Sequence, residues 1–356
     1  MMARALALAA RGLYTTTPNP RVGCVIARGD VVLGEGWHRR AGLPHAEVEA
    51  LDDARAKGHD VRGAVAYVTL EPCAHAGRTG PCSEALIAAG IGRVVAAMRD
   101  PHPTAAGGAE RLRAKGIPVE FGPGEAEALV MNRGFVSAVT RGLPWVRTKL
   151  AASLDGRTAL ANGTSQWITG TAARADGHAW RARACAILTG VGTVRDDDPE
   201  LTVRAVETPR QPLRVIVDRH GETPPGARVL AGGHALVVTA GGGNAHWPRG
   251  VETIELPDRE GRVDLPGLMR ALASRGIREL HVESGARLNG ALLAAGLIDE
   301  VLVYLAPSAI GDPARGMFDL REGLGSLRDR VRLAFESVER VGEDLRIVAL
   351  VHREGS

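Results

Sequence analysis

The sequence Pro44-His45-Ala46-Glu47, with Pro72-Cys73 and Pro81-Cys82 further along, decides how the first half of this chain folds. Catalytic zinc sites in proteins are tetrahedral, use three nitrogen or sulfur ligands and leave the fourth position to water. His45, Cys73 and Cys82 supply three such ligands. Glu47 is then a spare carboxylate that can carry protons. The pattern therefore predicts a zinc site that activates water.

The spacing of these residues carries further information. His45 and Glu47 are two positions apart, so a regular helix would not place them on one face. Proline is favoured at helix starts, so Pro44 predicts that both lie in an irregular first turn. Zinc nucleobase deaminases share the signature His-x-Glu followed by Pro-Cys-x-x-Cys. Here eight residues, 74–81, separate the cysteines, and this insert is rich in turn formers that could return Cys82 to the metal.

Strands and helices alternate around these motifs. Apolar periodicity predicts helices at 2–11, 44–57, 82–89, 111–115 and 125–140, and strands at 22–27, 31–36, 64–70, 93–98 and 119–121. Such alternation is typical of a layered α/β domain in which helices cover a sheet. The sequence Arg141-Gly-Leu-Pro144 breaks the pattern, so we place a domain boundary near residue 143.

The second half also reads as an α/β domain. Strands are predicted at 145–151, 186–189, 214–218, 235–239 and 301–306, and helices at 172–183, 268–274 and after residue 285. Several of these strands end in Gly, Ser or Thr and lead into helix starts, which is where open α/β sheets bind ligands. The run from Gly285 to Gly290 places backbone amides at a helix N-terminus, which suits a phosphate. These residues alone predict a domain that binds an anionic ligand.

Four segments together carry a resemblance to a known family. They are Thr17-Pro-Asn-Pro-Arg-Val-Gly-Cys24, Gly34-Glu-Gly-Trp-His38, Pro44-His-Ala-Glu-Val48 and Thr69-Leu-Glu-Pro-Cys-Ala-His-Ala-Gly-Arg-Thr-Gly-Pro-Cys82. They resemble the bifunctional riboflavin-biosynthesis deaminase/reductases, in which the eight-residue separation of the cysteines is a family trait. Ala74 and Gly80 depart from the Ser and Pro that are usual there. The second-half segments Lys149–Gly156 and His281–Gly290 resemble the reductase half of the same family.

The resemblance implies a fold and a reaction for each half. Residues 1–143 would form a cytidine-deaminase-like three-layer α/β/α domain, and residues 144–356 a dihydrofolate-reductase-like α/β domain. The first would bind one Zn²⁺ and hydrolytically deaminate 2,5-diamino-6-(5-phosphoribosylamino)pyrimidin-4-one. The second would use NADPH to reduce the ribosyl group to ribityl. The expected ligands are thus small phosphorylated pyrimidines, and a homo-oligomer (dimer or tetramer) is what the family suggests.

The resemblance also assigns roles to individual residues. In the first half, His45, Cys73 and Cys82 would bind the metal, Glu47 would carry protons, and Asn19, His38 and His75 would line the pyrimidine site. NADPH would contact Ala151, Trp167, Thr193, Asp197, Gly285, Ala286, Arg287, Leu288, Asn289, Gly290 and Ala291. The reductase substrate would contact Lys149, Ser165, Arg181, Leu201, Arg204 and Glu283. Arg181 and Arg204 suit a phosphate monoester, because a guanidinium can donate two hydrogen bonds to it.

Two alternatives of other classes remain at this point. A nucleic-acid or nucleoside deaminase with an accessory nucleotide-binding domain would need a basic, aromatic-bearing face. The net charge of +3 and the aromatic content of 3% argue against nucleic acid. A structural zinc module joined to a nucleotide sensor would need a fourth ligand, for which His75 is the candidate. The absence of a long apolar run, of a signal-peptide pattern and of a disulfide framework predicts no membrane span and a cytoplasmic protein.

Overall fold

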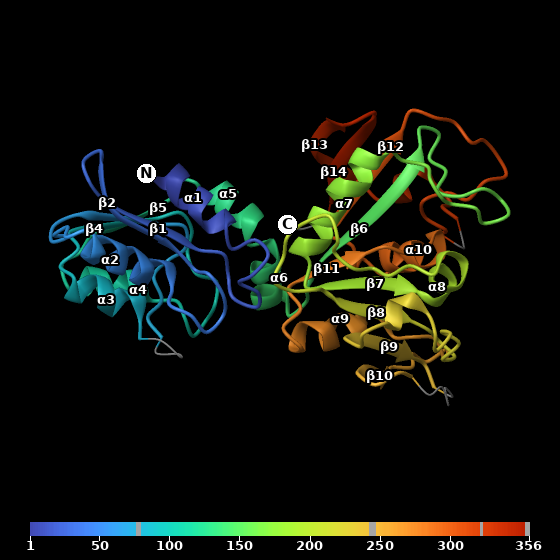
Figure 1. Cartoon of the computed structure of the whole chain (residues 1–356), viewed down its shortest axis with the longest axis horizontal. Coiled ribbons are helices and arrows are strands. Elements are labelled where there is room, and N and C mark those ends of the chain that lie inside the picture. Colours follow the sequence, from blue (N-terminus) through green and yellow to red (C-terminus); the bar gives the residue numbers. More distant parts are fainter. Residues whose placement is uncertain (76–79, 242–246, 321–322, 353–356) are drawn as a thin grey trace. The chain divides into compact units, whose positions relative to one another are not determined.

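The computed structural model describes residues 1–75, 80–241, 247–320 and 323–352. The chain forms two compact units, Met1–Gly142 and Leu143–Ser356 (Figure 1). We call them the first and the second unit. Each contains one sheet covered by helices and buries aliphatic side chains of its own. Within the described ranges, no helix combines the length and the hydropathy that a membrane crossing requires.

A five-stranded sheet forms the middle of the first unit. Its strands are β1 (Gly23–Arg28), β2 (Val31–Trp37), β3 (Val65–Val68), β4 (Arg93–Ala96) and β5 (Val119–Phe121), in the order β2-β1-β3-β4-β5. Strand β1 pairs antiparallel with β2 and with β3, whereas β3, β4 and β5 run parallel. The carboxyl ends of the parallel strands therefore meet at one edge, where ligands bind in sheets of this kind.

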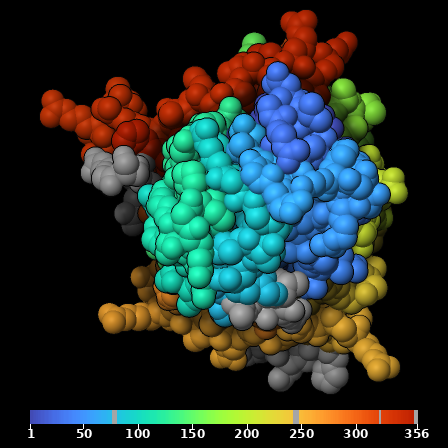
Figure 2. Space-filling model, turned by 90° about the vertical axis from the view of Figure 1, so that its left-hand side faces the viewer, coloured from blue at the N-terminus to red at the C-terminus, as the bar shows by residue number. Residues whose placement is uncertain are grey.

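Helices cover both faces of this sheet. Helices α1 (Met2–Ala10) and α5 (Glu125–Met131) lie on one face, and α2 (Ala46–Ala56), α3 (Cys82–Ala88) and α4 (Gly108–Ala114) on the other (Figure 1). The space-filling view shows this unit from one side, with its segments running from green through cyan to blue across the face (Figure 2). A Cβ at Gly23 would overlap the Ala5 carbonyl of α1, and a Cβ at Gly34 would overlap the Ala50 carbonyl of α2. Glycine at these positions therefore lets both helices pack close to the sheet.

The sequence predicted a single helix over 125–140, and this prediction is wrong. Two helices, α5 and α6 (Arg133–Arg141), meet at Asn132. The Asn132 side chain accepts a hydrogen bond from the Arg21 amide (2.8 Å) and donates one to the Arg21 carbonyl (3.0 Å). This buried contact between distant parts of the chain competes with continuous helix at that residue.

A nine-stranded sheet forms the middle of the second unit. The strands are β6 (Trp145–Ser153), β7 (Ala186–Gly190), β8 (Leu213–Val217), β9 (Ala235–Thr239), β10 (Val251–Glu255), β11 (Glu279–Val282), β12 (Glu300–Ala306), β13 (Leu333–Val341) and β14 (Asp344–Val351). Their order is β10-β9-β8-β7-β11-β6-β12-β14-β13. The pairs from β10 to β12 are parallel, and β14 and β13 extend the sheet antiparallel.

The helices of this unit are α7 (Thr171–Arg183), α8 (Val191–Asp197), α9 (Leu265–Ser274) and α10 (Ala286–Ala294). The two faces of the central strands differ sharply in chemistry. Val146 and Leu150 of β6 join an apolar core that contains residues of α9 and α10. The alternate residue Arg147 lies under Trp180 of α7, with 4.4 Å from its guanidinium carbon to the ring centroid, and pairs with the buried Glu300. The sheet face under α7 therefore carries buried charged side chains, beside a small apolar cluster in which Leu302 and Tyr304 of β12 pack near Trp180.

Candidate functional site

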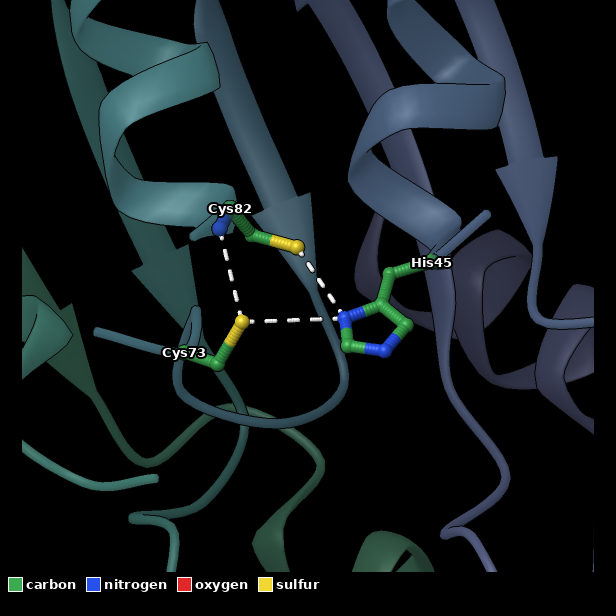
Figure 3. Close-up of side chains that lie close together, drawn as sticks. All are labelled: His45, Cys73 and Cys82. Atoms are coloured by element: carbon green, nitrogen blue, oxygen red, sulfur yellow. Dashed lines mark hydrogen bonds between the residues drawn. The ribbon is translucent and has the colours of Figure 1, made fainter. Parts of the chain in front are cut away.

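The predicted metal ligands converge in the first unit. His45 is the N-cap residue of α2 and has extended backbone, Cys82 is the first residue of α3, and Cys73 follows β3. The Nδ1 atom of His45 lies 3.2 Å from the Cys82 sulfur and 3.6 Å from the Cys73 sulfur (Figure 3). The Cys82 amide points at the Cys73 sulfur across 3.4 Å. Two helix starts thus face the same point, and their dipoles favour thiolate there.

This geometry fits a zinc ion. Zinc–sulfur bonds of about 2.3 Å and zinc–nitrogen bonds of about 2.0 Å, set at tetrahedral angles, place nitrogen and sulfur ligands roughly 3.6 Å apart. The ligand atoms of His45, Cys73 and Cys82 all lie within 4.8 Å of one another. Hydrogen bonding from the Cys82 thiol, with a further contribution from His45, lowers the pKa of Cys73 to about 4. In the part of the chain that the structure describes, no fourth ligand joins the group, as a catalytic site requires.

Glu47 lies beside the three ligands. It belongs to the first turn of α2, and only 3% of its surface is exposed. Burial, and then the charge of Cys73, raise the pKa of its carboxyl to about 7. Such a carboxyl can both accept and release a proton near neutral pH. The extended N-cap residue followed by the first helical turn brings His45 and Glu47 together despite their spacing.

Asn19 and His38 form a hydrogen-bonded pair next to this site. The His38 Nδ1 donates to the Pro44 carbonyl at 3.0 Å, and the Asn19 Nδ2 lies 3.1 Å from the His38 Nε2. Burial lowers the pKa of His38, so the ring is neutral, and its Nε2 must accept from Asn19. No described residue donates to the Asn19 Oδ1, which stays available as an acceptor. His75 is exposed, and residues 76–79 of the same insert lie outside the described residues.

Sequence reasoning missed Glu71, which positions the Cys73 segment. Its buried carboxylate accepts hydrogen bonds from three backbone amides, those of Gly107 (3.2 Å), Ala109 (3.0 Å) and Asp100 (3.2 Å). A Cβ at Gly108 would overlap the Pro72 carbonyl, so the two segments touch backbone to backbone. The only sequence feature that could have indicated this role is the acidic residue inside the Glu-Pro-Cys motif. Its hydrogen-bond partners are more than 25 residues away in the sequence, so the motif alone does not predict them.

In the second unit, several predicted substrate residues converge on the charged sheet face. Arg181 of α7 donates two hydrogen bonds to the Glu283 carboxylate (2.5 and 2.9 Å) and a third to the Thr202 carbonyl (3.1 Å). Burial opposes ionisation of Glu283, but Arg181 holds its pKa well below the ordinary value. Burial lowers the pKa of the nearby Lys149. Behind Glu283, the fully buried His281 places Nε2 3.4 Å from its carboxylate, a contact that the sequence did not indicate.

Predicted cofactor residues gather at the carboxyl ends of β7 and β11. Thr193 of α8 lies near Gly285, the N-cap residue of α10, with 3.8 Å from its hydroxyl to the position of a Cβ at Gly285. Ser165, predicted to contact substrate, donates to the Asp197 carboxylate at 2.9 Å. Trp167 is 70% exposed and carries the Arg174 guanidinium over its ring. Thr193 and Gly285 thus lie at the edge where open α/β sheets bind ligands, outside the carboxyl ends of the strands.

Two residues of the predicted cofactor run face the protein instead. Asn289 is buried, donates to the Ser284 carbonyl and accepts from the hydroxyls of Ser284 and Thr148. A Cβ at Gly290 would overlap backbone atoms of Asp319. Any ligand contact at these two positions would therefore use backbone atoms. Their neighbours on α10 are Ala286, Arg287, Leu288 and Ala291.

Three more predicted residues lie in different surroundings. The Leu201 side chain is buried in an apolar cluster with Val194 of α8, so it offers a ligand only its backbone. Arg204 is largely exposed; its guanidinium pairs with Glu200 and also donates to the Thr202 hydroxyl at 2.8 Å. Ala151 pairs with Tyr304 in the sheet register, two residues beyond Lys149 on β6.

Comparison with known proteins shows a family match for each of the two units. Residues 144–347 match the model of the RibD C-terminal domain, and residues 1–98 match the cytidine and deoxycytidylate deaminase zinc-binding region. The riboflavin biosynthesis protein RibD of Escherichia coli (strain K12) is 47% identical, covering 97% of this chain and 96% of its own. RibD of Acinetobacter baumannii superposes with a TM-score of 0.89 at 42% identity, covering 99% of this chain and 98% of its own. A deaminase/reductase of Thermotoga maritima superposes with a TM-score of 0.90 at 35% identity, covering 99% of this chain and 97% of its own.

The fold and the metal cluster define a zinc-dependent deaminase joined to a reductase domain. The chain belongs to the RibD family, the bifunctional deaminase/reductases of riboflavin biosynthesis. The family resemblance, the two-part α/β fold class and the enzymatic function expected from the sequence are thereby confirmed. Membership in an enzyme family favours this function over a nucleic-acid deaminase and over a structural zinc module.

Proposed function

We propose that this chain carries out two successive steps on one phosphorylated pyrimidine. The first unit would deaminate 2,5-diamino-6-(5-phosphoribosylamino)pyrimidin-4-one, and the second would reduce the ribosyl group of the product to ribityl with NADPH. The Thermotoga maritima relative is named for a deaminase and a reductase of such compounds. The observation that carries the proposal is the cluster of His45, Cys73 and Cys82 beside the buried Glu47.

In the deamination, Glu47 moves the protons. Zinc held by His45, Cys73 and Cys82 would supply Lewis acidity that lowers the pKa of water. Glu47 takes a proton from the attacking water and gives one to the ring amine that leaves as ammonia. Its pKa of about 7 suits both transfers. The Asn19 Oδ1, oriented by His38, accepts a hydrogen bond from an N–H group of the pyrimidine.

The Glu47→Gln variant tests this assignment. The amide cannot accept the proton, so ammonia release should fall about 10²- to 10⁴-fold while zinc content stays at one per chain. Glu49→Gln is the matched control, because Glu49 lies on the same helix and forms a partly exposed ion pair with Arg39. Undiminished ammonia release in Glu47→Gln would refute the assigned role.

In the reduction, the second unit orients two ligands. NADPH would supply the hydride to C1′ of the opened sugar. The ionised Glu283, fixed by Arg181, can accept hydrogen bonds from sugar hydroxyls. The amides at the start of α10, next to Thr193, can bind a phosphate of the cofactor.

NADPH consumption with the diaminopyrimidine as the sole substrate tests both halves at once. Glu47→Gln should consume NADPH only when given the deaminated compound, and consumption from the diaminopyrimidine would contradict the order of steps.

We also propose that the chain is a homo-oligomer that assembles through β13. This strand is the outer edge of the nine-stranded sheet. Phe335 is 74% exposed there and Val338 54%. A long edge strand with exposed apolar side chains is a site for association with another chain. Light scattering should report a dimer or tetramer, and Phe335→Asp should shift it towards monomer. A monomeric unmodified chain would refute the proposal.

A further inference from the structure

His178 lies at the centre of a cationic cluster in the second unit. It belongs to α7, one turn before Arg181. Partial burial lowers the pKa of its imidazole, and the charges of Arg181, Arg204 and Lys149 lower it further, against the opposing effect of Glu283. The charged groups facing His178 therefore come from three elements besides its own: β6, the end of β11 and the segment after α8. Sequence reasoning did not single out this histidine.

The cluster contains more cations than carboxylates. Glu283 is held by Arg181, and no described carboxylate lies within ion-pair distance of Lys149. Glu200 is shared between Arg204 and Arg228. Three cations, Lys149, Arg181 and Arg204, act on His178, and with Arg181 paired to Glu283 and Arg204 to Glu200 the lysine is left without a paired carboxylate. A phosphate monoester carries about 1.5 to 2 negative charges near neutral pH, so the remaining positive charge favours an anion of this kind.

The hydrogen bonding of His178 fixes what its ring can offer. The Arg204 backbone amide donates to the His178 Nδ1 at 3.2 Å. A ring nitrogen that accepts a hydrogen bond bears no proton, so the proton of the ring is on Nε2. No described residue accepts from Nε2. The partly exposed ring therefore has a free N–H donor beside the cluster that carries the excess positive charge, and this donor is available to an anion.

We propose that His178 binds the phosphate group of the reductase substrate through its Nε2–H, together with Lys149, Arg181 and Arg204. The inference rests on the proposed reductase function and adds a residue that determines specificity for the phosphorylated form. The same chemistry would also bind the 2′-phosphate of NADPH. The location of the cluster around Glu283, the proposed sugar contact, favours the substrate phosphate.

Two substitutions separate the anion contact from the contact with the Arg204 segment. In His178→Asn, the amide oxygen can replace Nδ1 as acceptor for the Arg204 amide, but no donor remains at the Nε2 position. His178→Gln can reach that position with its amide nitrogen. His178→Asn should raise the KM for the phosphorylated substrate roughly 10- to 100-fold with little change in kcat. It should leave the KM for phosphatase-treated substrate unchanged, and His178→Gln should recover part of the loss.

Further measurements distinguish the substrate phosphate from the 2′-phosphate of NADPH. They also distinguish a failure of this proposal from a failure of the proposed reductase function. If His178 binds NADPH instead, the KM ratio of NADPH to NADH changes in His178→Asn, which overturns the proposal. Equal KM changes with phosphorylated and phosphatase-treated substrate overturn it as well. Calorimetry with inorganic phosphate needs no turnover: the unmodified chain should bind it, and His178→Asn should bind it at least 10-fold more weakly. If NADPH oxidation is absent in the unmodified chain, the proposed function fails, while the phosphate titration still tests His178. An unchanged kcat with phosphatase-treated substrate shows that the second unit of His178→Asn is folded, and His220→Asn, at an exposed histidine, is the matched control.

Discussion

The contact between His38 and Asn19 allows a quantitative test of the deaminase site. In the structure His38 is neutral and accepts a hydrogen bond from the Asn19 Nδ2. His38→Leu would leave this partly buried amide without its acceptor and free to rotate. An unsatisfied polar group of this kind costs about 1 to 3 kcal/mol. Since about 1.4 kcal/mol corresponds to a factor of ten, kcat/KM for ammonia release should fall roughly 5- to 150-fold.

A double-mutant cycle identifies how that loss arises. If His38 acts by orienting Asn19, then His38→Leu should cost little in a chain that already carries Asn19→Ala. The coupling energy of the pair should then nearly equal the whole effect of His38→Leu. Zinc content must be measured in each variant, because His38 also binds the Pro44 carbonyl next to a metal ligand. The circular dichroism and the urea-unfolding midpoint of the first unit must also match those of the unmodified chain, because NADPH oxidation reports only on the second unit.

Additive losses would refute this reasoning. They would mean that His38 contacts the substrate independently of Asn19, and that its Nε2 is not occupied by the Asn19 amide during the reaction. Loss of zinc in His38→Leu alone would likewise show that the histidine acts through the metal segment.

The remaining predictions concern three positions. Glu283→Gln leaves the largely buried Arg181 without its carboxylate, which should destabilise the second unit by up to about 3 to 5 kcal/mol in urea unfolding and abolish NADPH oxidation. Burial raises the pKa of Asp100 from 3.8 to about 6, so the folded chain binds this proton more tightly and its stability falls as pH rises from about 4 to 6. Asp100→Asn should remove that fall, with a gain of up to about 3 kcal/mol at pH 7 and none at pH 4. Gly108→Ala should push the Pro72 carbonyl away and lower zinc content.

The chain offers controls for these variants. Gly80→Ala lies in the same metal segment, but no atom of the described residues lies within 4 Å of the new Cβ, so zinc should be retained. Loss of zinc in both glycine variants would contradict the steric explanation. An equal gain for Asp100→Asn at pH 4 and pH 7 would show that burial of charge is not the cause. Loss of ammonia release in Glu283→Gln would show damage beyond the second unit.

The metal ligands and Glu47 were predictable because a short motif specifies them. Strand, turn and helix start are encoded locally, so His45, Cys73 and Cys82 could be placed on their elements from the sequence. Strands β10, β13 and β14 were not predicted. Of these, β10 and β13 are largely exposed and lack the apolar run that marks a buried strand. The short helix α8 was missed as well.

Residues whose roles depend on distant contacts could not be found in this way. Glu71 acts through backbone amides of residues 100–109, and His178 through an amide 26 positions away. Asn132 interrupts a predicted helix because it binds Arg21, 111 positions earlier. In each case the decisive partner is set by the tertiary fold, and local propensity cannot reveal it.

The buried ion pairs under α7 imply that acid weakens the reductase half of this enzyme through its own carboxylates, whereas the buried Asp100 of the deaminase half has the opposite effect. Burial opposes ionisation of Glu283 and Glu300, yet their arginine partners hold both pKa values below the ordinary 4.5. Carboxyls with depressed pKa stabilise the fold above pH 4.5, and that stability is lost as pH falls through the folded values. Asp100 has the opposite sign and stabilises the first unit as pH falls from 6 to 4. In acid the reductase half should therefore unfold first, leaving a chain that still deaminates but no longer reduces its own product.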